Sequence, residues 1–105
     1  MAWIYLLVAG LLEVIWSYSM KLSDGFTRLT PSVVTVVMQI ASFWLLALAM
    51  RTIPLGSAYV IWTGIGAVGA FLVGIFLLAE PVNAMRVLAA VLIVAGLVLM
   101  RVASP

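Results

Sequence analysis

The sequence alternates long apolar runs with short polar breaks. Four runs approach the roughly 20 residues that a helix needs to cross a bilayer, and they cover residues 2–20, 32–50, 55–79 and 85–102. Residues that turn or interrupt helices lie in or next to the breaks, namely Gly25, Pro31, Pro54 and Pro81. The pattern predicts an all-α membrane protein, with four transmembrane helices forming a single domain over residues 1–105.

Composition supports a membrane protein and excludes several other classes. Hydrophobic residues make up 68% of the chain and charged residues 8%, whereas soluble domains are about 25% charged. Cysteine and histidine are absent, which removes disulfides and the usual zinc ligands. A net charge of +2 is too small to indicate nucleic-acid binding. We find no nucleophile–base pair, so neither an enzyme nor a cofactor or metal is expected. No basic region precedes the first run, which is therefore expected to be a retained helix.

One charged residue, Glu13, lies well inside an apolar run. The other seven of the eight charged residues stand at predicted helix ends or in the breaks. Insertion scales put an acidic residue at the centre of a membrane helix at roughly 2.5–3.5 kcal/mol, and a proton or a neighbouring cation lowers that cost. Lys21 lies about 12 Å further along the helix axis, too far to serve. Glu13 is therefore expected to take its positive charge alternately from a proton and from a cationic ligand.

The basic residues favour neither orientation in the membrane. They divide two against three between its sides, with Arg51 and Arg101 on one and Lys21, Arg28 and Arg86 on the other. Basic loop residues normally select the cytoplasmic side, so this division gives almost no preference. Two copies of opposite orientation could then form an antiparallel homodimer, with the inverted symmetry that larger transporters obtain from internal repeats. The alternative is one orientation, set by lipid or by a partner.

Polar side chains follow helical spacing in the first three runs. Residues three or four apart on a helix share a face. Around Glu13 this face holds Gly10, which leaves room, and the hydrogen-bond donors Trp16 and Ser17. Further candidates for the same pocket are Gln39 and Ser42 in the second run and Tyr59, Trp62 and Thr63 in the third. Backbone hydrogen bonds, packing or a place at the membrane interface are their alternative roles.

Small residues gather in the third and fourth runs. Gly64 and Gly66 could let helices approach closely, or they could form a hinge that exposes the pocket to one side and then the other. The sequence favours neither interpretation. Ala89 and Gly96 share one face of the fourth run, surrounded by leucine and valine. We assign that face to helix–helix contact in a dimer.

A longer pattern resembles a known family. Glu13 is followed by Gly25-Phe26-Thr27-Arg28, by Ser42-Phe43-Trp44, and by Ile-Pro-Leu-Gly-Ser-Ala-Tyr-Val-Ile-Trp-Thr-Gly-Ile-Gly-Ala-Val-Gly-Ala over residues 53–70. These residues, over essentially the full length, resemble the small multidrug resistance transporters. Trp16 and residues 62–70 are similar to the guanidinium-exporter branch of that family, whereas exporters of polyaromatic cations usually have glycine in place of Trp16.

The resemblance implies a multi-pass protein of the bacterial plasma membrane that forms a dual-topology, antiparallel homodimer and exchanges protons for guanidinium-type cations. It implies that Glu13 binds both proton and substrate and that Gly10 lines the pocket. The residues that would orient the two carboxylates of the dimer are Trp16, Ser42, Tyr59 and Trp62. Gln39 stands where the branch often has an apolar residue, so a larger substituted guanidine such as guanylurea is a candidate substrate.

Guanidinium suits a buried carboxylate because it is a small planar cation with a fork of donors. Burial disfavours the charged form of a carboxyl group, so Glu13 is expected to hold a proton part of the time near neutrality. If proton and cation compete for the two Glu13 side chains, exchange follows without another coupling device. The alternatives are an exporter of quaternary ammonium or aromatic drug cations, one subunit of a heterodimer, and a structural membrane protein.

Overall fold

The computed structural model describes residues 1–104. In that range the chain forms four helices: α1 (Ala2–Leu22), α2 (Leu29–Ala49), α3 (Leu55–Leu78) and α4 (Ala84–Ala103). Each helix overlaps one apolar run, and each is long and apolar enough to cross a membrane. The predicted all-α class with four membrane-length helices is confirmed.

The helix ends differ from the predicted ones by a few residues, for local reasons. α2 begins at Leu29 and not at residue 32, because Pro31 is tolerated in the first turn, where no helical N–H bond is needed. α3 ends at Leu78, since Ala79 adopts a left-handed conformation with φ +54°. The N–H of Glu80 then donates to the Gly74 carbonyl at 3.0 Å, a common way to close a helix.

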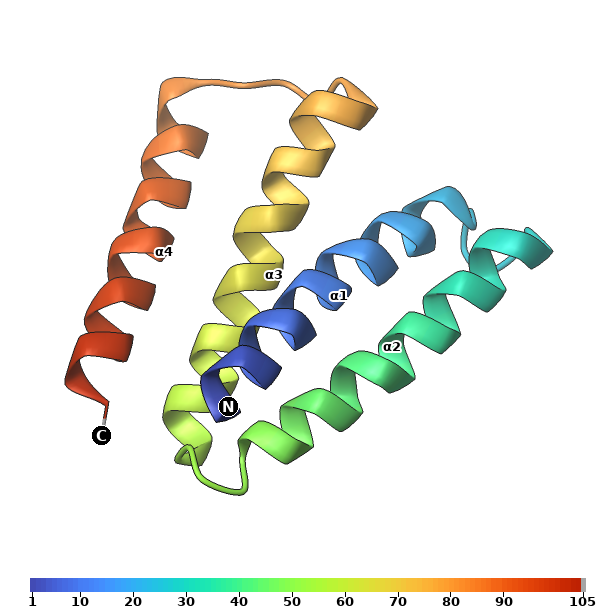
Figure 1. Cartoon of the computed structure of the whole chain (residues 1–105). Helices are drawn as coiled ribbons and strands as arrows, with labels where there is room; N and C mark the ends of the chain where they lie inside the picture. The colour runs from blue at the N-terminus through green and yellow to red at the C-terminus, as the bar shows by residue number, and fades with distance from the viewer. Residues whose placement is uncertain (105) are drawn as a thin grey trace.

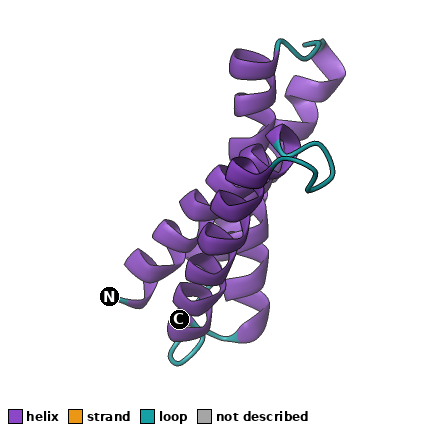
Figure 2. Ribbon diagram, turned by 90° about the vertical axis from the view of Figure 1, so that its right-hand side faces the viewer, coloured by secondary structure: helices purple, strands orange, loops and turns teal. Residues whose placement is uncertain are grey.

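The helices lie side by side in one layer. Figure 1 shows the order α2, α1, α3, α4, and within the described residues the backbone of α4 lies beside α3 alone, while the Arg101 guanidinium reaches the Trp3 ring of α1 at 4.2 Å from its centroid. The Cα atoms extend over 42 × 34 × 16 Å. The shortest extent is less than half of either of the others, and Figure 2 shows the layer turned by 90°. A single layer has two broad faces and cannot enclose a pathway alone.

The buried core is small and asymmetric. It joins the N-terminal half of α1, the C-terminal end of α2 and the N-terminal half of α3, and consists of Leu6, Ala9, Leu46, Ala49, Ile53, Ala58, Ile61 and Trp62. Helix α4 has no buried residue. Large exposed apolar surfaces mark contact with lipid or with another chain, so most of α4 is available for such contact.

The charged residues other than Glu13 are divided between the two ends of the layer. Figure 1 shows both termini and the α2–α3 loop at one end, and the α1–α2 and α3–α4 loops at the other. The basic side chains therefore separate as the sequence predicts, Arg51 and Arg101 at one end and Lys21, Arg28 and Arg86 at the other. Insertion in both orientations stays a prediction.

Candidate functional site

Glu13 lies where α1 crosses α3, and glycines make this crossing close. A Cβ atom on Gly66 would overlap the Glu13 carboxyl group, and one on Gly10 would lie 2.6 Å from a methyl carbon of Ile65. Glycine at these two positions lets each backbone approach a side chain of the other helix. The Glu13 side chain therefore rests directly against the backbone of α3.

Two buried polar atoms near this crossing have no partner within the chain. Among residues 1–104, Oε1 of Glu13 and Nε1 of Trp16 are buried and make no hydrogen bond. A buried polar atom without a partner typically costs about 1–3 kcal/mol, and more for a charged group. Both atoms therefore favour a group from outside the chain, a proton or a donor-rich cation at Glu13 and an acceptor at Trp16.

The predicted hydrogen bonds from Trp16 and Ser17 to Glu13 are not formed in the described chain. The Ser17 hydroxyl donates to the Val14 carbonyl at 2.9 Å, a backbone partner that serine in a helix often takes. The Trp16 ring packs edge-on against Phe43 of α2, with 6.4 Å between ring centroids. Helical spacing shows which residues share a face, but it does not decide which partner each side chain takes.

Ser42 connects three helices one turn from Glu13. Its hydroxyl donates to the Ala9 carbonyl of α1 at 2.7 Å and accepts from Nε1 of Trp62 of α3 at 3.1 Å. The same carbonyl is the helical acceptor for the Glu13 N–H. The resemblance implies that Ser42 and Trp62 orient the carboxylates of the dimer, and that role stays a prediction. In this chain Trp62 binds Ser42, and Ser42 binds the backbone that carries Glu13.

Four aromatic rings form a row across α1, α2 and α3. In this aromatic row Trp16 contacts Phe43, Phe43 contacts Trp62 with 5.7 Å between centroids, and Trp62 contacts Tyr59 with 5.6 Å. Phe43 and Tyr59 are 47% and 52% exposed, so the row reaches the surface of the layer. Aromatic faces attract cations. Phe43 was not predicted as a site residue, because a lone aromatic in an apolar run carries no signal beyond its place next to Ser42.

Two further candidates lie apart from this network. Gln39 is partly buried on α2, and it makes no side-chain hydrogen bond in the part of the chain that the structure describes. Because Ser42 faces Ala9 and the two helices run antiparallel, Gln39 lies near the level of Glu13. Thr63 instead lines a cavity of about 480 Å³ between α3 and α4. The structure therefore does not bring Thr63 to the carboxylate.

Residues 1–93 match the family described as Small Multidrug Resistance protein. The chain belongs to this family. Among its relatives, the guanidinium exporter of Yersinia pseudotuberculosis is 54% identical over 104 residues, which cover 99% of this chain and 100% of the relative. The guanidinium exporters of Salmonella typhimurium and Escherichia coli (strain K12) are each 52% identical over 104 residues, 99% of both chains.

These similarities confirm the resemblance seen in the sequence, both to the small multidrug resistance family and to its guanidinium exporters. A chain of this family with four membrane-length helices is a multi-pass membrane protein. The prediction that it is not an enzyme is also confirmed, because its relatives are named as exporters. Within residues 1–104, no group of three histidine, cysteine, aspartate or glutamate residues could hold a metal ion.

In this family member the glycines of α3 serve close packing. A Cβ atom on Gly64 would overlap Leu97 of α4, as one on Gly66 would overlap Glu13. A hinge at these residues stays a prediction. Ala89 and Gly96 are exposed on α4, and the space beside Gly96 is open. The predicted contact of this face with a second chain is therefore sterically feasible.

We expect Ser42→Ala to lower stability. The change removes the bond to Ala9 and leaves the Trp62 N–H buried without its acceptor, which typically costs about 1–3 kcal/mol. Thermal unfolding in detergent measures this loss of stability. Thr35→Val is the matched control, because the equally buried Thr35 hydroxyl donates only to Pro31 of its own helix at 2.8 Å. Equal losses in both variants would show that the bond across helices has no special role.

Proposed function

We propose that this protein exports guanidinium or small substituted guanidinium cations across the bacterial plasma membrane in exchange for protons. The observation that carries the proposal is the buried Glu13 oxygen without a partner in the described chain. The full-length similarity to guanidinium exporters supports the choice of cation.

The surroundings of Glu13 suit a flat, donor-rich cation. A guanidinium group can give two parallel N–H bonds to one carboxylate, and it also stacks on aromatic faces. The aromatic row begins at Trp16, on the turn after Glu13, and continues to α2 and α3. Glu13 is therefore proposed to bind the cation, with the row beside it shaping the pocket.

Coupling follows if proton and cation share one site. A protonated Glu13 is neutral and has lost its attraction for a cation, and a bound cation in turn disfavours protonation. The site then carries one or the other across the membrane. A conformational change that exposes the same site to alternate sides completes the exchange, and the inward proton gradient drives export.

We propose an antiparallel homodimer as the working unit. One layer of helices leaves Phe43 and Tyr59 of the aromatic row on an open face, and Glu13 is only partly buried. A second copy could cover that face and bring a second Glu13 to the same pocket. Ala89 and Gly96 on the exposed face of α4 are the proposed contact between copies.

Two observations bear on the range of substrates. Gln39 lies near the level of Glu13 with its amide uncommitted, which favours a guanidine with a polar substituent such as guanylurea. The half-exposed rings of Phe43 and Tyr59 favour the second candidate function, export of larger aromatic or quaternary ammonium cations. A transport panel of guanidinium, guanylurea and tetraalkylammonium ions separates these. Strong transport of bulky cations with little guanidinium transport would favour the second function.

Transport in proteoliposomes tests the shared site through its dependence on pH. Protons that occupy Glu13 exclude guanidinium, so lowering the pH raises the guanidinium concentration needed for half-maximal transport, by at most about tenfold per pH unit for each competing proton. Proton movement, followed with a pH-sensitive dye, should accompany guanidinium movement in the opposite direction. Guanidinium transport without proton movement would contradict the exchange mechanism.

A further inference from the structure

A second carboxyl group rests against α3, beyond Glu13. Glu80 follows the end of α3, and its side chain folds back so that a Cβ atom on Gly74 would lie 2.5 Å from the carboxyl oxygen Oε1. Gly66, which accommodates Glu13, lies about 12 Å earlier along the helix axis. Two carboxyl groups thus contact glycines of α3. The Glu13 carboxyl group lies within the span, and the Glu80 carboxyl group lies at its end.

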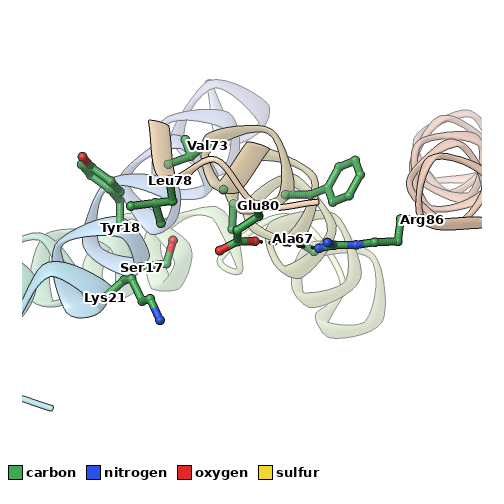
Figure 3. Close-up of a pocket in the computed structure, with 11 residues that line it drawn as sticks. Ser17, Tyr18, Lys21, Ala67, Val73, Leu78, Glu80 and Arg86 are labelled. Atoms are coloured by element: carbon green, nitrogen blue, oxygen red, sulfur yellow. Dashed lines mark ion pairs between the residues drawn. The ribbon is translucent and has the colours of Figure 1, made fainter. Parts of the chain in front are cut away.

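A cavity of about 330 Å³ lies beside Glu80 and extends along α1 and α3 in the direction of Glu13, and Figure 3 shows the residues that line it. Its inner part is lined by Ser17, one turn after Glu13, and by Ala67, the neighbour of Gly66. Its outer part is lined by Glu80 and Arg86. The cavity therefore follows the α1–α3 seam from near the proposed site to the α3–α4 loop.

This outer part already binds a guanidinium group, that of the Arg86 side chain. One terminal nitrogen lies 3.8 Å from the Glu80 carboxyl oxygen, and the other donates to the Pro81 carbonyl at 2.7 Å. The central carbon lies 5.4 Å from the centre of the Phe71 ring. A carboxylate, a carbonyl and an aromatic face are the partners that guanidinium prefers. Arg86 thus presents the same chemical group as the proposed substrate.

The ion pair between Arg86 and Glu80 is weak enough to be exchanged. The ion pair is a single contact at 3.8 Å, and the two side chains are 37% and 40% exposed. Ion pairs of this kind contribute little, because water and salt screen them. A displaced arginine at the end of a helix can move its charge into water.

The surroundings also favour a cation over an anion. α1 and α3 both end at this cavity, and the last carbonyls of a helix have no helical donor and form the negative end of its dipole. Lys21 lines the cavity as well, but no ion pair joins it to Glu80 in the described chain. An anionic group such as phosphate would face the Glu80 carboxylate, so Lys21 and Arg86 do not make this an anion site.

We propose that the Glu80 pocket is an outer site for guanidinium-class cations, and that the Arg86 side chain is a tethered competitor which the entering cation displaces. The identity of the cation rests on the proposed function. The exchange replaces one guanidinium group at Glu80 with another, so the carboxylate stays paired throughout. In an antiparallel dimer, the two copies would place one such pocket at each side of the membrane.

Opposite effects of two substitutions test this site. Glu80→Gln removes the acceptor and should raise the guanidinium concentration for half-maximal transport about two- to fivefold, as expected for an exposed charge pair. Arg86→Gln removes the competitor and should lower that concentration, with the maximal rate kept. If the pair only fastened the loop, both variants would shift in the same direction and lose stability together, and that result would overturn the proposal.

A direct measurement separates this inference from the proposed function. In a Glu13→Gln background the central site is removed, and the ¹⁵Nε resonance of Arg86 is followed during titration with guanidinium chloride. The resonance should move in that variant and not with potassium chloride of equal ionic strength. An unchanged resonance, or a response to phosphate in place of guanidinium, would overturn the outer site. Failure of the proposed function would appear separately, as transport that survives Glu13→Gln.

Discussion

Guanidinium transport by the Glu13→Gln variant is expected to fall to the rate of protein-free liposomes. Glutamine has nearly the same shape and can keep the contact with Gly66, but it carries no charge and releases no proton. Hydrogen bonds to charged groups contribute about 1.5–3 kcal/mol each, so the loss of one lowers affinity roughly 10- to 100-fold. The loss of proton exchange then removes the coupling as well. Uptake of radiolabelled guanidinium under an imposed pH gradient measures the effect.

Asp24→Asn is the matched control for this variant. It removes one negative charge from the exposed α1–α2 loop, away from the proposed site. Asp24 has φ +50°, and asparagine tolerates this left-handed region better than most residues. Transport should stay close to that of the unchanged protein. If the Glu13 variant transported as well as the Asp24 variant, the carboxyl group of Glu13 would not be the shared site.

Gly66→Ala is expected to reduce transport strongly with little loss of stability. The new methyl group would overlap the Glu13 carboxyl group, and a flexible side chain can avoid it by turning to another rotamer. Alanine also favours the helix by about 1 kcal/mol over glycine, so the fold should persist. The Glu13 carboxylate would however lose its contact with the α3 backbone at residue 66. Displacing a binding group by about 1 Å can lower rates by roughly 100-fold.

Gly56→Ala provides the control within the same helix. A Cβ atom on Gly56 would meet no atom within 4 Å, so the change adds helix propensity without a clash. Its transport should match that of the unchanged protein, and thermal unfolding should show equal or higher stability. Comparable transport by the two alanine variants would mean that the close contact of Gly66 with Glu13 has no functional role.

Part of the candidate site was predictable because its charge marks it. A single carboxylate within an apolar run is conspicuous whatever the fold, so Glu13 stood out as a candidate, and helical spacing placed Gly10 on the same face. The contacts of the other candidates were not predictable. Ser42 meets Ala9 across 33 residues of chain, and spacing along one helix carries no information about such a distance. For the same reason Phe43 was overlooked, and spacing did not reveal that Thr63, a possible pocket residue, lines the cavity between α3 and α4.

The sequence by itself determined the class of the protein, its four spans and the one charged residue that lies within a span. These follow from the transfer of each segment into lipid, which depends on local composition. Only the tertiary structure decided which glycines contact the carboxyl groups of Glu13 and Glu80 and which helices Ser42 joins. It also decided that the Arg86 guanidinium lies beside Glu80. Such contacts depend on how helices cross, and the crossing is set by side chains from different spans that the order of residues alone does not bring together.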